Sequence, residues 1–171
     1  MCGIVGYIGT KRAQDFVVDG LEKLEYRGYD SAGIAVNTGE PYFSITKKEG
    51  RLQKLADELI KNPLEGTIGI GHTRWATHGK PSDTNSHPHF NKDKSIVVVH
   101  NGIIENYLEL KKDLIGKGYE FLSETDTEVI AHLLDYNFKG DILKAVQDTL
   151  KSLRGAYALG VMSTKDPDRI I

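Results

Sequence analysis

Ser95-Ile96-Val97-Val98-Val99-His100 is the stretch of this sequence that says most about the fold. Its four central residues are apolar, with no polar residue between them. A strand with one solvent-facing side alternates apolar and polar residues, whereas an unbroken apolar run is typical of a strand that is buried on both faces. We therefore expect a layered protein, with this strand inside a sheet that is covered on both sides.

The residues on either side of this run predict further strands and amphipathic helices. Strands are expected at residues 2–8, 32–36, 42–48, 67–73 and 156–163. Helices are expected at residues 13–25, 51–61 and 106–117, after Asp126 as a helix N-cap, and from Asp141 through Leu153. Residues 81–94 are polar and predict a long loop. The pattern indicates one domain of the α+β or layered α/β class, with mostly antiparallel strands.

The composition is that of an ordinary globular domain, with 39% apolar and 27% charged residues over 171 positions and a net charge of -2. This charge gives no reason to expect nucleic acid or an anionic membrane as a partner. No apolar run approaches the ~20 residues that a membrane-spanning helix needs. The first apolar stretch, Ile4 to Ile8, has no basic residues before it, unlike a secretory signal. We expect a cytoplasmic protein.

Cys2 is the only cysteine, so an internal disulfide is excluded. A lone cysteine is usually a buried apolar side chain, but position 2 gives this one a second interpretation. Met1 before a small residue is commonly excised, which would leave a free α-amine on Cys2. An α-amine titrates near ~7.7–8.0 and can act as a base, next to a thiol that is nucleophilic as the thiolate. Nucleophile and base would then belong to one residue, as in N-terminal threonine hydrolases.

Two segments that follow predicted strands carry groups suited to a binding or catalytic site. In the first, residues 71–79 (GHTRWATHG), Arg74 could hold a carboxylate with two parallel hydrogen bonds. A surface arginine beside a core tryptophan explains the same residues. In the second, residues 100–106 (HNGIIEN), the Asn101 amide and the Gly102 N–H could donate to a developing oxyanion. A plain Asn-Gly turn is the alternative.

Asp126 lies in the segment 123–128 (SETDTE) and allows two interpretations. Its carboxylate could cap the helix that follows, or it could hold an ammonium group of a substrate. Both roles use the same carboxylate oxygens, so they compete.

Five of the six histidines fall in one part of the chain, which raises the question of a metal site. They are His72, His78, His87, His89 and His100. Their spacing does not resemble a zinc ligand set, and no second cysteine or acidic cluster accompanies them. We expect no metal and no cofactor, and keep a metal-dependent hydrolase as a separate hypothesis.

Five segments, taken together and in order, resemble the class II glutamine amidotransferases of the N-terminal-nucleophile hydrolase superfamily. They are residues 1–6 (MCGIVG), 25–33 (EYRGYDSAG), 72–79 (HTRWATHG), 100–106 (HNGIIEN) and 123–128 (SETDTE). The spelling of the second and third is similar to that of the branch of this family that aminates fructose-6-phosphate. The resemblance covers essentially the whole chain.

The resemblance implies roles for nine residues. Cys2 would be the nucleophile, with its own amine as base and then acid, and Asn101 and the Gly102 N–H would form the oxyanion hole. The other six would bind glutamine or shape its pocket: Arg74 and Thr77 at the α-carboxylate, Asp126 at the α-ammonium beside the Gly102 carbonyl, and Trp75, His78 and Arg27 around them.

The resemblance also implies a four-layer αββα sandwich of two antiparallel sheets. The implied activity is hydrolysis of the glutamine side-chain amide through a Cys2 γ-glutamyl thioester. In the complete enzyme, the ammonia would convert fructose-6-phosphate to glucosamine-6-phosphate. The alternatives are a non-catalytic fragment that binds glutamine or takes part in assembly, and another class II amidotransferase.

The complete enzymes of this branch carry two sugar-isomerase domains after the glutaminase domain, and the present 171 residues do not include them. Arg169-Ile170-Ile171 has the character of a strand that is beginning. We therefore expect residues 1–171 to be a glutaminase domain that is incomplete at its C-terminal end. Its expected partners are glutamine and the sugar-isomerase domains, and a homo-oligomer is compatible with the resemblance.

Overall fold

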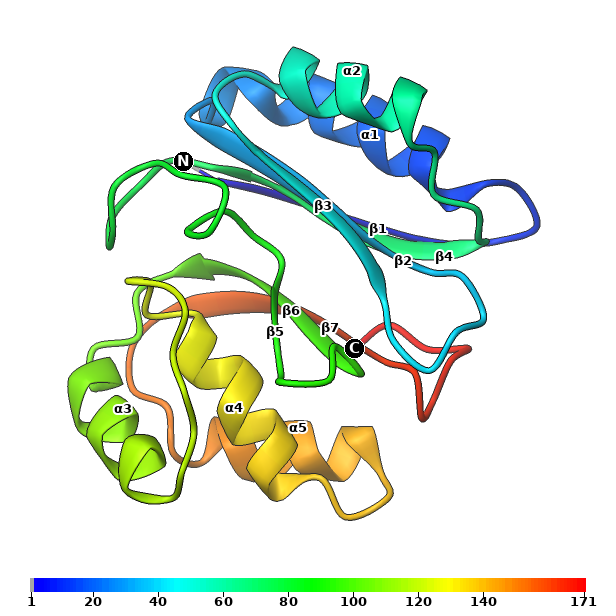
Figure 1. Ribbon diagram of the computed structural model, residues 1–171. Helices are drawn as coiled ribbons and strands as arrows, with labels where there is room; N and C mark the ends of the chain where they lie inside the picture. The colour runs from blue at the N-terminus through cyan, green and yellow to red at the C-terminus, as the bar shows by residue number, and fades with distance from the viewer. Residues whose placement is uncertain (1) are drawn as a thin grey trace.

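Two antiparallel sheets lie face to face in the computed structural model, which describes residues 2–171, and helices cover the outer face of each sheet (Figure 1). The first sheet has the order β1-β4-β2-β3, with strands β1 (Gly3–Ile8), β2 (Ser31–Asn37), β3 (Ser44–Glu49) and β4 (Ile68–Arg74). The second has the order β5-β6-β7, with strands β5 (His89–Phe90), β6 (Ile96–Gly102) and β7 (Tyr157–Ser163). The expected αββα sandwich is confirmed.

The helices divide between the two outer layers (Figure 1). The first sheet is covered by α1 (Ala13–Leu24) and α2 (Leu52–Lys61), and the short helix η1 (Glu25–Arg27) follows α1. The second sheet is covered by α3 (Tyr107–Gly116), α4 (Glu128–Asn137) and α5 (Ile142–Leu150). None of the helices within residues 2–171 is both long enough and apolar enough to cross a membrane.

The unbroken apolar run in β6 is explained by the two layers that it separates. Val97 and Val99 belong to the core between the two sheets, where they pack with Ile70 of β4. Ile96 and Val98 point the other way and belong to the core between the second sheet and its helices. All four side chains of the run are at most 1% exposed. The prediction of a strand buried on both faces is confirmed.

Two boundaries in the second sheet differ from the sequence prediction. β6 continues to Gly102, so Asn101 and Gly102 belong to the strand rather than to a turn after it. Residues 81–94 contain β5, which pairs with β6 through His89 and Phe90. A strand of two residues is too short to show the alternation that would predict it.

The two aspartates expected to cap helices behave differently. Asp141 caps α5, because its side chain accepts a hydrogen bond from the Lys144 N–H. The cap expected of Asp126 was wrong: α4 begins at Glu128, with no side-chain cap, and Asp126 accepts a hydrogen bond from the Ile104 N–H instead.

Ile171 lies beside β7 and exchanges both backbone hydrogen bonds with Val161, at 2.8 and 3.0 Å. This exchange is the pattern of an antiparallel pair, as expected from the strand character of residues 169–171.

The start of β1 and the ends of β4 and β6 meet at one edge of the sandwich. Gly3 pairs with Thr73 in the first sheet, so Cys2 lies beside the last residues of β4. Asn101 of the second sheet reaches across the two layers to the Cys2 carbonyl oxygen. The residues that the sequence predicts for a site therefore lie together at this edge.

Candidate active site

A cleft of about 500 Å³ opens at this edge of the sandwich. It is lined by Cys2, Arg27, Arg74, Trp75, Thr77, His87, His100, Asn101, Gly102, Ile103, Thr125, Asp126 and Thr127. Eight of the nine residues predicted for the site are among these, and His78 is the exception. The fold thus brings together residues that lie in five separate segments of the sequence.

Cys2 lies immediately before β1 and is partly buried. Its Sγ accepts a hydrogen bond from the Trp75 N–H at 3.2 Å and lies 3.6 Å from the Trp75 carbonyl oxygen. Burial raises the pKa of the thiol, and the Trp75 N–H opposes that rise only in part. The thiol therefore needs a base before it can attack. The expected removal of Met1 concerns a residue outside the described range.

Asn101 presents its side-chain amide from the end of β6. Its Nδ2 donates to the Cys2 carbonyl oxygen at 3.3 Å, and its Oδ1 lies 2.9 Å from Nε2 of His72. An amide nitrogen carries two N–H groups, and the Cys2 carbonyl uses one of them. Gly102 follows with a φ of +123°, and a Cβ there would lie 2.3 Å from the Ala156 carbonyl oxygen. Only glycine fits this position.

Arg74 ends β4 and is only 4% exposed. Its Nη2 donates to the carbonyl oxygens of His78 and Gly79, while its buried Nη1 has no hydrogen-bond partner among the residues that the structure describes. Burial lowers the pKa of the guanidinium, against the opposing charges of Asp30 and Cys2. One nitrogen of a buried cation is thus left for a ligand.

His78 contributes to the site through its main chain, since its carbonyl oxygen helps to fix Arg74. Its ring packs edge-on against Tyr107, with the ring centroids 5.0 Å apart. His78 does not line the cleft. The role expected of its ring in shaping the pocket stays a prediction.

Trp75, Thr77 and Arg27 line the cleft with side chains that are exposed or half-buried. The Trp75 side chain is 48% exposed and packs edge-on against Tyr29, with the centroids 5.5 Å apart. Thr77 is exposed, and Arg27 is half-buried at the end of η1. These three residues can contact a ligand without being part of the protein core.

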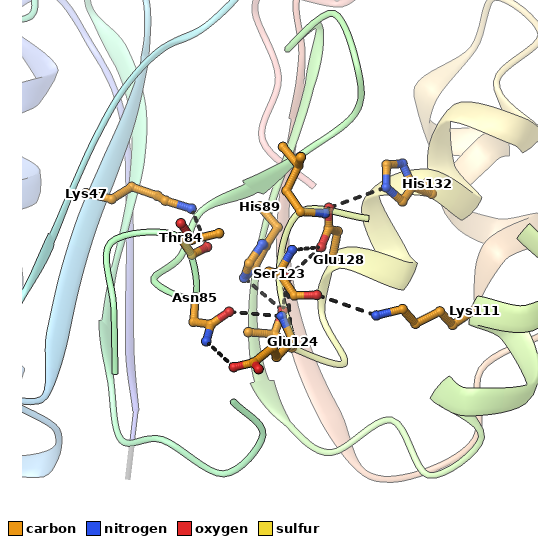
Figure 2. Close-up of polar contacts among 11 residues, drawn as sticks. Lys47, Thr84, Asn85, His89, Lys111, Ser123, Glu124, Glu128 and His132 are labelled. Atoms are coloured by element: carbon orange, nitrogen blue, oxygen red, sulfur yellow. Dashed lines mark hydrogen bonds and ion pairs between the residues drawn. The ribbon is translucent and has the colours of Figure 1, made fainter. Parts of the chain in front are cut away.

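Asp126 reaches the cleft from the loop before α4 and is only 4% exposed. Its Oδ2 accepts the Ile104 N–H at 2.8 Å. The loop is fixed on one side by Asn85, which accepts the Glu124 N–H at 2.9 Å and donates to the Glu124 carboxylate at 3.1 Å (Figure 2). The carboxylate of Asp126 is therefore carried by a loop with a defined position.

Glu128 fixes the same loop from the other side (Figure 2). Its carboxylate accepts the N–H groups of Leu122 and Ser123, at 2.8 and 2.7 Å, and the Ser123 hydroxyl at 2.6 Å. Burial alone would raise the pKa of Glu128, but its contact with His132, at 3.6 Å, and the hydrogen bonds from Leu122 and Ser123 outweigh it and lower the pKa to about 2. This carboxylate is ionised at neutral pH and serves to hold the loop.

Asp30 supports the site from outside the cleft lining, and sequence reasoning did not single it out. Its carboxylate accepts the Ala76 N–H, and its own N–H donates to the Arg74 carbonyl oxygen at 3.2 Å. It therefore sets the path of the chain immediately after β4. It lies in one of the quoted motifs, but a loop aspartate has too many common roles for sequence alone to assign this one.

His72, His87 and His89 form a cluster of buried rings. The His72 and His87 rings stack with their centroids 4.1 Å apart, and His89 packs against the His87 ring at 4.9 Å. Burial lowers the pKa of His72 to about 3 and that of His87 and His89 well below the ordinary value. Within residues 2–171, no group of three or more His, Cys, Asp or Glu side chains is placed to hold a metal ion.

Residues 72–171 match the model of a family described as "Glutamine amidotransferase domain". The chain belongs to this family. The amidotransferase domain is 58% identical over 172 residues to a Clostridium acetobutylicum protein named glutamine–fructose-6-phosphate aminotransferase (isomerizing). It is 59% identical over 172 residues to a protein of the same name from Caldanaerobacter subterraneus. Each match covers 100% of this chain and 28% of the relative, so the chain spans 28% of the length of these relatives.

The fold of the amidotransferase domain matches solved structures over nearly its whole length. Glutamine phosphoribosylpyrophosphate amidotransferase from B. subtilis, complexed with ADP and GMP, superposes with a TM-score of 0.82 and 29% sequence identity. The match covers 96% of this chain and 35% of that one. The resemblance to class II glutamine amidotransferases is thereby confirmed for both sequence and fold.

Proposed function

We propose that this amidotransferase domain hydrolyses the side-chain amide of glutamine, with Cys2 as the nucleophile. The observation that carries the proposal is the content of one cleft: a partly buried thiol, the Asn101 amide donor, and Arg74 with a buried nitrogen that pairs with nothing within residues 2–171. Family membership supports glutamine as the substrate.

The reaction begins when the α-amine of Cys2, free once Met1 is removed, takes the thiol proton. The thiolate attacks the side-chain carbonyl carbon of glutamine, and the Asn101 amide and the Gly102 N–H donate to the oxygen that becomes negative. Donors fixed before the reaction cost no reorganisation at that moment, and losing one typically costs ~10²–10³ in rate. The amine then returns the proton to the leaving nitrogen, and ammonia departs from a γ-glutamyl thioester.

Water completes the cycle by the same route. The Cys2 amine takes a proton from water, which attacks the thioester carbonyl carbon, and the carbon–sulfur bond breaks. Glutamate leaves, and the thiol regains its proton. Two partial reactions with one nucleophile replace a single slow hydrolysis.

Arg74 and Asp126 supply the orientation. They are both buried and both line the cleft, with opposite charges. The α-carboxylate of glutamine is paired with the free edge of the Arg74 guanidinium, near Thr77, and its α-ammonium with Asp126 and the Gly102 carbonyl oxygen. Two charged contacts at one end of the substrate place the amide at the other end against Cys2.

We further propose that the ammonia is used by sugar-isomerase domains to convert fructose-6-phosphate to glucosamine-6-phosphate. The support is the name of the relatives and their 58–59% identity to this chain. The proposal predicts that this chain, joined to the sugar-isomerase part of such a relative, forms glucosamine-6-phosphate from glutamine. If the joined chain formed glucosamine-6-phosphate from free ammonia but not from glutamine, the proposal would be contradicted.

The glutaminase reaction is tested by measuring glutamate and ammonia released from L-glutamine by the chain and by its Cys2→Ala variant. We expect equal amounts of both products from the parent chain and none above background from the variant, at an unchanged melting temperature. Intact mass should show a chain that begins at Cys2. No release by the parent chain, or equal release by the variant, would contradict the proposal.

A further inference from the structure

His72 contacts the oxyanion donor without lining the cleft. It lies in β4, is 1% exposed, and faces Asn101 across the space between the two sheets. Its Nε2 is 2.9 Å from Asn101 Oδ1 and 3.0 Å from the His100 carbonyl oxygen. A carbonyl oxygen only accepts hydrogen bonds, so Nε2 of His72 carries the proton and donates.

The protonation of His72 does not change over the pH range in which proteins work. Burial, the largest effect, lowers its pKa to about 3, so the ring is neutral and has one N–H. That N–H is on Nε2, which leaves Nδ1 as an acceptor. Protonation of the ring would add a proton at Nδ1 and leave the Nε2 N–H in place, so the donor to Asn101 is present in either form.

The Asn101 amide is held at both of its ends. Its oxygen receives the His72 N–H, and its nitrogen donates to the Cys2 carbonyl oxygen at 3.3 Å. The opposite orientation would set its NH2 against the His72 N–H and its oxygen against the Cys2 carbonyl oxygen. Both of those contacts are repulsive, so a single orientation remains, with the NH2 toward Cys2.

The position of the His72 ring is fixed by packing. One face stacks on His87, with centroids 4.1 Å apart and planes at 14°. The His87 ring is fixed in turn, because its Nδ1 accepts the His100 N–H at 3.2 Å and its Nε2 lies 3.3 Å from the Thr127 hydroxyl. His72 also pairs with Gly33 across β2 and β4. A Cβ on Gly33 would lie 2.0 Å from the His87 carbonyl oxygen, so glycine at this position leaves room for the His87 backbone.

We propose that His72 is a positioning residue for the oxyanion hole: it orients the Asn101 amide so that the NH2 faces Cys2 before glutamine binds. The proposal rests on the proposed function of Asn101 as an oxyanion donor. His72 makes no contact with the substrate in this role and exchanges no proton. Its effect is on kcat rather than on substrate binding, because the oxyanion forms in the tetrahedral intermediates and the transition states that flank them, and not in bound glutamine.

The kinetic test compares His72→Leu, which removes the donor, with His72→Gln, which keeps an N–H in reach. We expect His72→Leu to lower kcat for glutamine hydrolysis about 10-fold to 100-fold with KM nearly unchanged, since a misplaced catalytic group can cost ~10² in rate. His72→Gln should restore most of kcat. Gln14→Leu, which removes a buried polar side chain (7% exposed) in α1 and outside the cleft, is the matched control and should leave kcat unchanged.

A double-mutant cycle separates positioning from general damage. In an Asn101→Ala background, His72→Leu should cost nothing further, because the group that it positions is absent. A further loss of the same size in that background would overturn the proposal, as would a His72→Gln variant no better than His72→Leu. If His72→Leu kept full activity while Asn101→Ala lost it, the positioning role would be overturned and the proposed function would stand.

A spectroscopic measurement tests the proposal independently of activity. The side-chain NH2 signals of Asn101, assigned by their loss in Asn101→Ala, should shift and exchange faster with water in His72→Leu. They should stay in place in Gln14→Leu and move little in His72→Gln. Unchanged Asn101 signals in His72→Leu would refute the positioning role whether or not the chain hydrolyses glutamine.

Discussion

Arg74 and Glu128 are both buried charged side chains, each only 4% exposed, but their surroundings differ. The Glu128 carboxylate accepts three hydrogen bonds from its own loop. Arg74 uses one guanidinium nitrogen on two carbonyl oxygens, and its other terminal nitrogen has no hydrogen-bond partner within residues 2–171. Glu128 lies behind the loop that carries Asp126, whereas Arg74 lines the cleft.

The difference separates a charge that maintains structure from a charge that is kept for a ligand. Burying a polar group without a partner costs free energy, and a protein recovers that cost only when a partner arrives. Glu128 has its partners in the unliganded fold, so its contribution is to stability. Arg74 lacks one, so we expect its main contribution to appear when glutamine binds.

The largest effect is expected from Arg74, and it concerns the KM for glutamine. Arg74→Ala should raise KM for glutamine about 100-fold with a smaller change in kcat, because a charge-assisted hydrogen-bonded pair is worth ~1.5–3 kcal/mol. Arg74→Lys keeps the charge but loses the planar pair of donors, so it should recover only part of the affinity. The readout is steady-state glutaminase kinetics. An Arg74→Ala variant with an unchanged KM would place the carboxylate site elsewhere.

A smaller effect on the structural side is expected from Glu128→Gln. The substitution removes the charge and turns one acceptor oxygen into a donor that faces a donor of Leu122 or of Ser123. The free energy of unfolding should fall by about 2 kcal/mol, as for a lost hydrogen bond to a charged group. Denaturant titration measures it, and Glu109→Gln, an exposed position in α3, is the matched control with no expected loss. Equal stability of both variants would show that the Glu128 contacts contribute nothing.

The same contacts of Glu128 also predict a pH dependence of stability. Its pKa is lowered from 4.5 to about 2 in the folded chain. A lowered carboxylate pKa gives stability that is fully present above pH 4.5 and is lost as the pH falls toward 2. The parent chain should therefore lose more unfolding free energy than Glu128→Gln over that window. Parallel pH profiles for the two chains would contradict this assignment.

The sequence predicts the layers of this fold better than the contacts between them. The apolar run 96–99 indicates burial on both faces, and the helical spacing of apolar residues elsewhere indicates amphipathic helices. These signals are local. The two-residue strand β5 has no such signal, because its existence depends on β6 lying beside it.

The candidate site shows the same limit. The motifs name Cys2, Arg74 and Asn101, and the fold brings them to one cleft. The mistaken cap at Asp126 arises because a sequence cannot tell whether a carboxylate turns to its own helix or to the Ile104 N–H. The contact between His72 and Asn101 depends on the packing of one sheet against the other, which no spacing in the sequence encodes.

The most direct test of the account is to find the bond that Cys2 is proposed to form. The chain is mixed with L-glutamine, quenched in acid during turnover, and digested for mass spectrometry of the peptide that begins at Cys2. We predict the added mass of one γ-glutamyl group on that peptide, removed by hydroxylamine as a thioester would be, and absent from Cys2→Ala. The account would be contradicted if glutamate were released steadily while the γ-glutamyl group was found on another residue. It would also be contradicted if Cys2→Ala released glutamate as fast as the parent chain.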